Sequence, residues 1–164
     1  MQITSNRRKF LTGAATALAV PILASCGGTP AQAKNFPVSK SDAQWRKQLT
    51  SAEYNVLRKE STERAFSSPL NKEKRKGTYK CAGCGNRIYS SAHKYDSGTG
   101  WPAFYKPIDG GAVATSTDYK IGYPRTEVHC ADCGGHLGHI FGDGPKPTGK
   151  RHCINGVAMD FVPA

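Results

Sequence analysis

Acidic residues and long hydrophobic runs are scarce in this chain. Of its 164 residues, 12 are Asp or Glu and 23 are Lys or Arg, which gives a formal net charge of +11. A surface of this charge could attract nucleic acid or anionic lipid. The sequence has no dense stripe of basic residues interleaved with aromatic ones, however, and this argues against a nucleic-acid partner. We interpret the basic cluster at residues 72–76 as a solvated connecting loop.

Internal repeats are also absent, apart from two cysteine pairs, and the length favours a single domain. Hydrophobic residues make up 38% of the chain, which is enough for a small core. Eighteen glycines and ten prolines indicate many turns. The composition therefore favours a mainly β fold over a helical bundle.

The first 33 residues have the features of an export signal. Paired arginines, Arg7 and Arg8, precede an apolar run at residues 10–23 that is too short for a membrane span. The pair resembles the signal of the twin-arginine (Tat) export route. We therefore divide the chain into an export signal and tether at residues 1–33 and a folded domain at residues 34–164, with export to the periplasm or cell envelope. An uncleaved N-terminal anchor is the alternative.

Two processing sites compete within this segment. Residues 23–26, Leu-Ala-Ser-Cys, resemble a lipobox, in which Cys26 would carry a lipid and anchor the protein to the membrane. Residues 31–33, Ala-Gln-Ala, have the small-x-small pattern that precedes cleavage by signal peptidase. Lipidation and simple secretion both stay open.

Two short helices are expected at the start of the domain, followed by strands. Ser41 and Thr50 each begin a capping box, with Gln44 and Glu53 three residues later. From Gly77 onward, short apolar segments alternate with Gly, Pro and Asp turns, which favours an antiparallel sheet system. The expected strands are residues 79–81, 86–89, 101–105, 112–117, 119–123, 126–130, 137–141, 151–155 and 157–162.

Four cysteines form two Cys-x-x-Cys pairs, Cys81 with Cys84 and Cys130 with Cys133. A glycine inside or just after each pair lets backbone amides turn beneath the sulfurs. Two matched pairs favour one Zn²⁺ ion, and four sulfur ligands leave it no open position for catalysis. We therefore predict a structural zinc site whose pairs lie on separate hairpins. Disulfides and a thioredoxin-like redox pair are the alternatives.

Cys153 stands alone near the C-terminus and is the candidate nucleophile. In an extended segment, Arg151, Cys153 and Asn155 would lie on one face, where the guanidinium could stabilise a thiolate. His136 and His139 offer a general acid. The alternative is a cysteine that is simply buried.

Trp101 and Phe104 follow a pair of glycines, Gly98 and Gly100. Trp101 could form the wall of a pocket for a small methyl-bearing group. Phe104 could line the same pocket or belong to the core, as aromatic residues commonly do.

Together these motifs resemble the methionine-R-sulfoxide reductases of the B type, over roughly residues 45–161. The matching residues are Cys81, Cys84, Asp96-Ser97-Gly98, Gly100-Trp101-Pro102, Phe104, Glu127-Val128, Cys130, Cys133, His136-Leu137-Gly138-His139, Phe141, Asp143-Gly144-Pro145, Thr148-Gly149, Arg151 and Cys153-Ile154-Asn155.

The resemblance implies two antiparallel sheets in a β-tent arrangement, with zinc remote from the catalytic cysteine. It implies that Cys153 attacks the sulfur of methionine-R-sulfoxide in oxidised proteins, becomes a sulfenic acid and leaves methionine. His139, with His136, would stabilise or protonate the sulfoxide oxygen, and Trp101 would contact the substrate methyl group. Such an enzyme would act as a monomer in protein repair under oxidative stress. The site would also be shaped by Asn155, Arg151 and Asp143.

Thr99, Ala103 and His152 depart from the family pattern, and the departure at Thr99 matters most. Many members have a resolving cysteine between the two glycines, where this chain has Thr99. Without it, the sulfenic acid at Cys153 has no intramolecular partner outside the zinc site except Cys26, which lipidation would block. The sequence therefore predicts recycling by an external small thiol or a thioredoxin-like protein.

Two other functional classes compete with the enzyme. One is a zinc-ribbon binding module without catalytic activity, and the export signal argues against its use on nucleic acid. The other is a general thiol-disulfide oxidoreductase that uses one Cys-x-x-Cys pair. Zinc bound to that pair would make its thiols unreactive.

Overall fold

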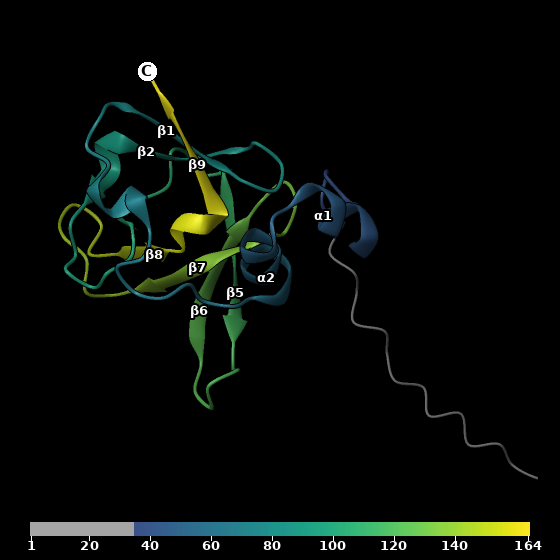
Figure 1. The fold of residues 1–164 in the computed structure, drawn as a ribbon. Coiled ribbons are helices and arrows are strands. Elements are labelled where there is room, and N and C mark those ends of the chain that lie inside the picture. Colours follow the sequence, from purple (N-terminus) through teal and green to yellow (C-terminus); the bar gives the residue numbers. More distant parts are fainter. Residues whose placement is uncertain (1–34) are drawn as a thin grey trace, which may run out of the picture. The chain divides into compact units, whose positions relative to one another are not determined.

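The structure, a computed structural model, describes residues 35–164 (Figure 1). The predicted export signal, the Cys26 lipidation site and the cleavage site after Ala33 lie outside the described residues. Within the described part, no helix has both the length and the hydropathy needed to cross a membrane.

The domain begins with two short helices, α1 (Asp42–Gln48) and α2 (Ser51–Lys59). The hydroxyls of Ser41 and Thr50 accept hydrogen bonds from backbone amides three residues later, and the side chains of those later residues accept from the backbone amides of Ser41 and Thr50. Both predicted capping boxes are therefore confirmed. Trp45, Val56 and Leu57 are buried, so each helix packs one face on the core.

The strands form two antiparallel sheets, which confirms the predicted fold class. One sheet has three strands in the order β2-β1-β9, and the other has six in the order β3-β4-β8-β7-β6-β5 (Figure 1). A short 3₁₀ helix, η1 (Pro69–Lys72), precedes the first strand, and two others, η2 (Ser91–His93) and η3 (Gly156–Ala158), connect the sheets. The strands are β1 (Gly77–Cys81), β2 (Arg87–Ser90), β3 (Lys94–Tyr95), β4 (Ala103–Phe104), β5 (Val113–Asp118), β6 (Arg125–Cys130), β7 (His136–Phe141), β8 (Arg151–Ile154) and β9 (Met159–Pro163).

Three of the strand predictions differ from the structure. Residues 119–123 are not a strand but the turn that joins β5 to β6, because Gly122 adopts a positive φ of 87° and the two strands already pair up to Asp118 and Arg125. The strand predicted at 101–105 is only two residues long. The strand predicted at 157–162 begins with η3 and becomes extended at Met159.

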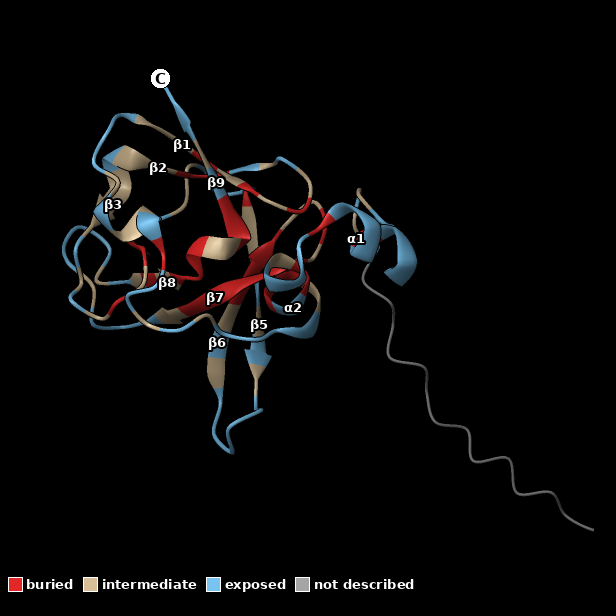
Figure 2. Cartoon of the chain, viewed as in Figure 1, coloured by how far each residue is buried: buried red, intermediate tan, exposed pale blue. Residues whose placement is uncertain are grey.

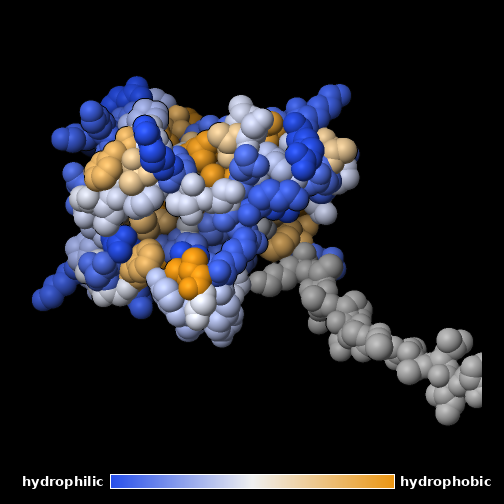
Figure 3. All heavy atoms as spheres, turned by 60° about the horizontal axis from the view of Figure 1, so that its bottom comes forward, coloured by the Kyte–Doolittle hydropathy of each residue, from blue (hydrophilic) through white to orange (hydrophobic). Residues whose placement is uncertain are grey.

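The turn between β5 and β6 exposes several large apolar side chains. Tyr119, Ile121 and Tyr123 are 67%, 50% and 59% exposed. Figure 3 turns this end of the molecule toward the reader, and hydrophilic side chains cover most of the face while hydrophobic ones form small separate groups. The apolar residues that predicted a strand here therefore have no core to face.

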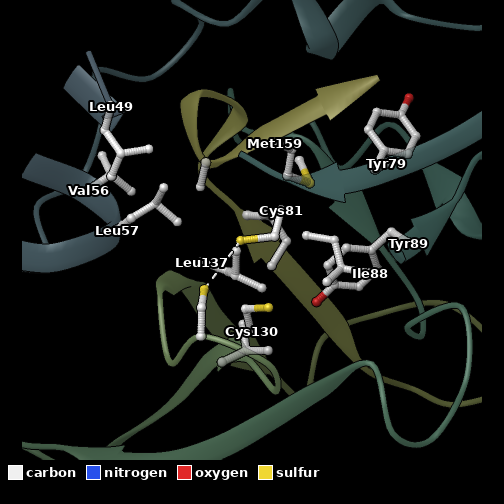
Figure 4. Close-up of a cluster of buried hydrophobic side chains, with 14 of the residues drawn as sticks. Leu49, Val56, Leu57, Tyr79, Cys81, Ile88, Tyr89, Cys130, Leu137 and Met159 are labelled. Atoms are coloured by element: carbon white, nitrogen blue, oxygen red, sulfur yellow. Dashed lines mark hydrogen bonds between the residues drawn. The ribbon is translucent and has the colours of Figure 1, made fainter. Parts of the chain in front are cut away.

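The core lies where α2 and both sheets meet (Figure 2). Leu57 comes from α2, Ile88 and Met159 from the three-stranded sheet, and Leu137 from the six-stranded sheet, and these side chains surround Cys81 in Figure 4. Farther along, Tyr79, Phe104 and Tyr89 are fully buried, and the rings of Tyr89 and Phe104 stack with their centroids 4.3 Å apart. The cysteine cluster is thus part of the core that joins the two sheets.

Candidate functional site

Two hairpins of the same local geometry carry the four paired cysteines. Cys81 ends β1 and Cys84 lies in the turn to β2, while Cys130 ends β6 and Cys133 lies in the turn to β7, so the prediction of separate hairpins is confirmed. In each turn the first cysteine donates its backbone N–H to the residue five positions later, over 2.8 Å in one hairpin and 2.9 Å in the other. In each, the residue after the second cysteine is a glycine at positive φ, 79° and 66°. The two Cys-x-x-Cys-Gly segments therefore form the same turn, as their matching sequences predict.

The four sulfurs fit a tetrahedral Zn²⁺ site. They all lie within 4.8 Å of one another. The Cys81–Cys133 and Cys84–Cys130 sulfur distances, which link the two hairpins, are 3.7 and 3.5 Å. Zinc–sulfur bonds of about 2.3 Å in a tetrahedron place the sulfurs about 3.8 Å apart. All four cysteines are free rather than disulfide-bonded, and the geometry supports one structural zinc ion.

A separate pocket of about 150 Å³ contains Cys153. Cys153 on β8 and His139 on β7 face each other as paired residues of neighbouring antiparallel strands, so their side chains emerge on the same side of the sheet. The pocket is lined by Thr62, Trp101, Arg125, Gly138, His139, Phe141, Cys153 and Asn155. The structure thus brings together four of the predicted site residues, from three separate segments of the chain.

Gly138, between the two histidines of the motif, allows β7 and β8 to approach closely. A Cβ atom at this position would lie 2.0 Å from the carbonyl oxygen of Cys153, well inside van der Waals contact. Only glycine leaves room for that carbonyl, and the spacing of the two strands sets how His139 lies beside Cys153. The glycine therefore contributes to the site through the backbone.

The thiol of Cys153 is half-buried, and this burial raises its pKa. Two neighbours oppose the effect: Thr99, whose Oγ1 lies 4.0 Å from the sulfur, and the positive charge of Arg151. Arg151 acts in the predicted direction but does not outweigh burial. Asp143 holds the guanidinium with two hydrogen bonds of 2.8 and 2.9 Å, and the guanidinium carbon lies 4.4 Å from the ring centre of Phe141.

His139 is oriented by an acid that the sequence patterns did not single out. Its Nε2 lies 2.8 Å from Oδ2 of Asp118, at the end of β5, and Arg125 pairs with the same oxygen. The amide of Lys120, His139 and Arg125 together lower the pKa of Asp118 to about 2, so this carboxylate is ionised and accepts a hydrogen bond from the Nε2–H of His139. Burial lowers the pKa of His139, which is therefore neutral near pH 7.

His136 lies behind the pocket rather than in it. Its Nδ1 is 2.8 Å from Oε1 of Glu127, and its ring is 5.3 Å from that of His139, centre to centre. Burial raises the pKa of Glu127, but hydrogen bonds from His129, His136 and Ser116 outweigh burial and hold it well below its usual range. Nε2 of His136 has no hydrogen-bond partner among the described residues. His136 is thus placed to support His139.

Three residues predicted to bind substrate, Phe104, Arg151 and Asp143, do not line the pocket. Phe104 is fully buried and stacked on Tyr89, so the structure places it in the core, the second of the two sequence interpretations. Asp143 is exposed and reaches the site only through Arg151. Patterns of neighbouring residues could not reveal Asp118, Arg125 or Thr62 as site residues, because each joins the site through folding of a distant segment.

The SelR-domain family model matches residues 49–163. The chain belongs to the SelR-domain family. A relative from Leptospira interrogans, named peptide methionine sulfoxide reductase MsrB, is 51% identical over 127 residues, which are 77% of this chain and 97% of the relative. Relatives of the same name from Agrobacterium fabrum and Methanosarcina barkeri are 51% identical over 126 and 124 residues, which cover 77% and 76% of this chain and 93% and 87% of theirs.

The matched SelR domain contains the whole pocket and all four clustered cysteines. Helix α1 precedes the matched range, which begins at Leu49. The site that the structure assembles is therefore a property of the SelR domain itself.

Proposed function

We propose that the chain is a peptide-methionine (R)-S-oxide reductase, with Cys153 as its nucleophile. The observation that carries the mechanism is the pairing of Cys153 with His139 across β7 and β8, in a pocket that also contains Trp101. The membership of the SelR-domain family and the names of the relatives support the reaction. The small volume of the pocket suits one side chain of an oxidised protein.

In the proposed reaction, the sulfur of Cys153 attacks the sulfoxide sulfur, and the oxygen is transferred to the cysteine. Methionine sulfur gains two electrons, the thiol loses two, and Cys153 becomes a sulfenic acid. The Nε2–H of His139, which is bonded to Asp118 in the structure, would turn to the sulfoxide oxygen when substrate binds, with His136 behind it. Trp101 would contact the substrate methyl group, Asn155 would complete the walls, and Arg151 would act on the thiol of Cys153.

The thiol must become a thiolate to attack. Burial alone works against this, because it raises the pKa of Cys153, while Thr99 and Arg151 work in favour of it. A bound sulfoxide that hydrogen-bonds to His139 would bring the reacting sulfur into contact with a thiol already held beside these two groups.

The zinc site would act on stability, not on the reaction. Cys81, Cys84, Cys130 and Cys133 would hold the ion, which supplies folding free energy when bound. The cluster joins the β1–β2 and β6–β7 hairpins within the core, so it holds the two sheets together.

The sulfenic acid would be reduced by an external donor. Thr99 occupies the position beside Cys153 from which a second cysteine could form a disulfide. A small thiol or a thioredoxin-like protein would instead attack the sulfenic acid, releasing water and leaving a mixed disulfide, and a second thiol would then restore Cys153. The enzyme would work as a monomer on oxidised proteins.

Export belongs to the same proposal. The sequence of residues 1–33 supports Tat-dependent export to the periplasm or cell envelope, with lipidation at Cys26 or cleavage after Ala33 as the two routes of processing. There the enzyme would repair envelope proteins during oxidative stress. Metabolic labelling with a fatty acid, in the wild type and in Cys26→Ala, would distinguish the two routes.

The decisive experiment offers the R and S epimers of a methionine sulfoxide peptide to the wild type and to Cys153→Ser, with dithiothreitol as reductant. We expect the wild type to reduce only the R epimer and the variant to reduce neither, with zinc content and fold unchanged. Absence of turnover of either epimer by a folded, zinc-loaded wild type would favour the zinc-ribbon binding module instead.

A further inference from the structure

The segment of residues 60–68 connects α2 to η1 without a helix or strand of its own, yet it borders the pocket. Thr62 lines both the Cys153 pocket and a larger cavity, of about 790 Å³, next to it. The next residue, Glu63, is half-buried and lines the larger cavity. Although Glu63 lies in a loop, both its backbone and its side chain form hydrogen bonds with residues at or next to the Cys153 site.

The backbone of Glu63 holds two side chains of the pocket. Its N–H donates to Oδ1 of Asn155 over 2.9 Å, and its carbonyl oxygen accepts from Nε1 of Trp101 over 3.1 Å. Asn155 also donates its Nδ2 to the carbonyl of Leu137 on β7, so its carboxamide is held at both ends. The orientations of Trp101 and Asn155 therefore depend on where residue 63 lies.

The side chain of Glu63 fixes that position. Its two carboxylate oxygens accept the backbone N–H groups of Gly156 and Val157, over 2.6 and 3.0 Å. Those two residues follow Asn155 directly and begin η3, whose first amides have no partner within the helix. An ionised acceptor makes such bonds about twice as strong as a neutral one. The carboxylate thus ties the 60–68 segment to the chain just after Asn155.

We propose that Glu63 is a positioning residue for the Cys153 site. Its carboxylate anchors the 60–68 segment on η3, and its backbone then holds Trp101 and Asn155 in place around the pocket. This inference rests on the proposed sulfoxide reductase function for its kinetic consequence, but the positioning of Trp101 can be measured without any substrate.

Glu63→Gln tests the proposal with little change in size. The amide of Gln keeps one acceptor oxygen but turns an NH₂ group toward the second backbone N–H, so one of the two anchoring bonds is lost. The matched control is Glu53→Gln. Glu53 also lines the larger cavity and also accepts a backbone N–H at a helix start, that of Thr50 over 2.7 Å, but the structure shows no bond from it to the pocket.

We expect Glu63→Gln to lower kcat/KM for the R epimer by roughly 10- to 100-fold, because small displacements of positioning groups have effects of that size. Glu53→Gln should stay close to the wild type. In a Trp45→Phe background, where Trp101 is the sole tryptophan, Glu63→Gln should shift its emission and increase its quenching by acrylamide.

Equal kcat/KM in the two variants would overturn the proposal, even if both were less stable than the wild type. A wild type without turnover would defeat the proposed function alone. The fluorescence of Trp101 would then decide: a change in Glu63→Gln and not in Glu53→Gln would support positioning, and no change would overturn it.

Discussion

The four-cysteine cluster and the Cys153 pocket place the same side chain in two different surroundings. The clustered sulfurs lie within 4.8 Å of one another and belong to the core, where two hydrogen-bonded hairpin turns bring them together. The sulfur of Cys153 has no other cysteine beside it among the described residues and borders an open pocket with a histidine, a tryptophan and an arginine. The first arrangement suits metal binding, and the second suits attack on a small substrate.

The difference shows that the neighbours of a cysteine decide its chemistry. In the cluster, three further sulfurs complete a closed ligand set. Beside Cys153, Thr99 and Arg151 favour the thiolate while burial favours the thiol. Changes that affect one region and leave the other intact should therefore separate stability from reactivity.

The largest effect should come from breaking the cluster. Cys81→Ser removes one of four ligands of the buried site, and we expect loss of zinc together with loss of soluble folded protein, since structural zinc contributes about 10 kcal/mol or more to folding in small domains. Metal analysis and circular dichroism measure both effects. A stable, fully active variant would contradict a structural metal.

The next contrast is in reactivity with iodoacetamide. In the zinc-loaded protein, peptide mapping should find the label on Cys153 and not on the four clustered cysteines. Because burial raises the pKa of Cys153, labelling should be slow at pH 7 and accelerate about tenfold per pH unit up to that pKa. Labelling of the clustered cysteines in zinc-loaded protein would contradict the expected difference in reactivity. A labelling rate of Cys153 that does not change between pH 7 and 9 would contradict the raised pKa.

A pH-dependent effect should arise beside Cys153, at His152. Burial first, and then the charge of Lys150, lowers the pKa of His152 from 6.5 to about 4. Below about pH 6.5 the unfolded chain gains a proton that the folded chain does not bind until about pH 4. Stability should therefore fall across this interval by about 2–3 kcal/mol.

The variant His152→Phe isolates this effect. It loses the 3.0 Å hydrogen bond between Tyr89 and the imidazole at every pH, but it has no group to titrate. Urea unfolding at pH 7.5 and 4.5 should show a smaller difference in stability for the variant than for the wild type. Equal differences would show that His152 is not the titrating group.

A smaller effect is expected from Gly138→Ala. The new methyl group would meet the carbonyl of Cys153, a backbone atom that cannot move without shifting β8, and we expect a loss of about 1–3 kcal/mol together with reduced turnover. Gly142→Ala is the matched control, since a Cβ there meets nothing within 4 Å. Thermal unfolding and kcat/KM compare the two. Identical behaviour of the two variants would exclude a special role for the glycine.

The smallest effect on stability should come from Thr99→Cys, within about 0.5 kcal/mol of the wild type. The new sulfur would lie close to Cys153, given the present distance of 4.0 Å from Oγ1, and could form a disulfide after one turnover. Dimedone should then trap the sulfenic acid in the wild type but not in the variant, as mass spectrometry would show. A persistent adduct in the variant would mean that the two sulfurs cannot meet.

Much of the fold could be predicted because its signals are local. Capping boxes at Ser41 and Thr50 fix the helix starts through bonds to residues three positions away. Short apolar segments between turn residues predicted most strands, but the same pattern at 119–123 was misleading, since an exposed hairpin turn has no neighbouring strand or core. Local pattern is a reliable guide only where tertiary packing uses it.

The candidate site divides in the same way. Sequence spacing indicated the cysteine ligands, Cys153, His139, Trp101 and Asn155. It could not indicate Asp118, which orients His139, or Glu63, which holds Trp101 and Asn155, because both come from segments distant in sequence. From the sequence, Phe104 could belong either to the pocket or to the core, and its packing against Tyr89 in the structure places it in the core.

The sequence by itself determined the parts of this protein whose geometry closes within a few residues: the two zinc-binding turns, the helix starts and the identity of the lone cysteine. Tertiary structure alone decided how the thiol of Cys153 is tuned, since burial, Thr99 and Arg151 act on it from three directions. It also decided which groups surround the thiol, through the pairing of β7 with β8 and the anchoring of the 60–68 segment on η3. Hydrogen bonds and burial act through space, so their effects appear only when distant segments meet.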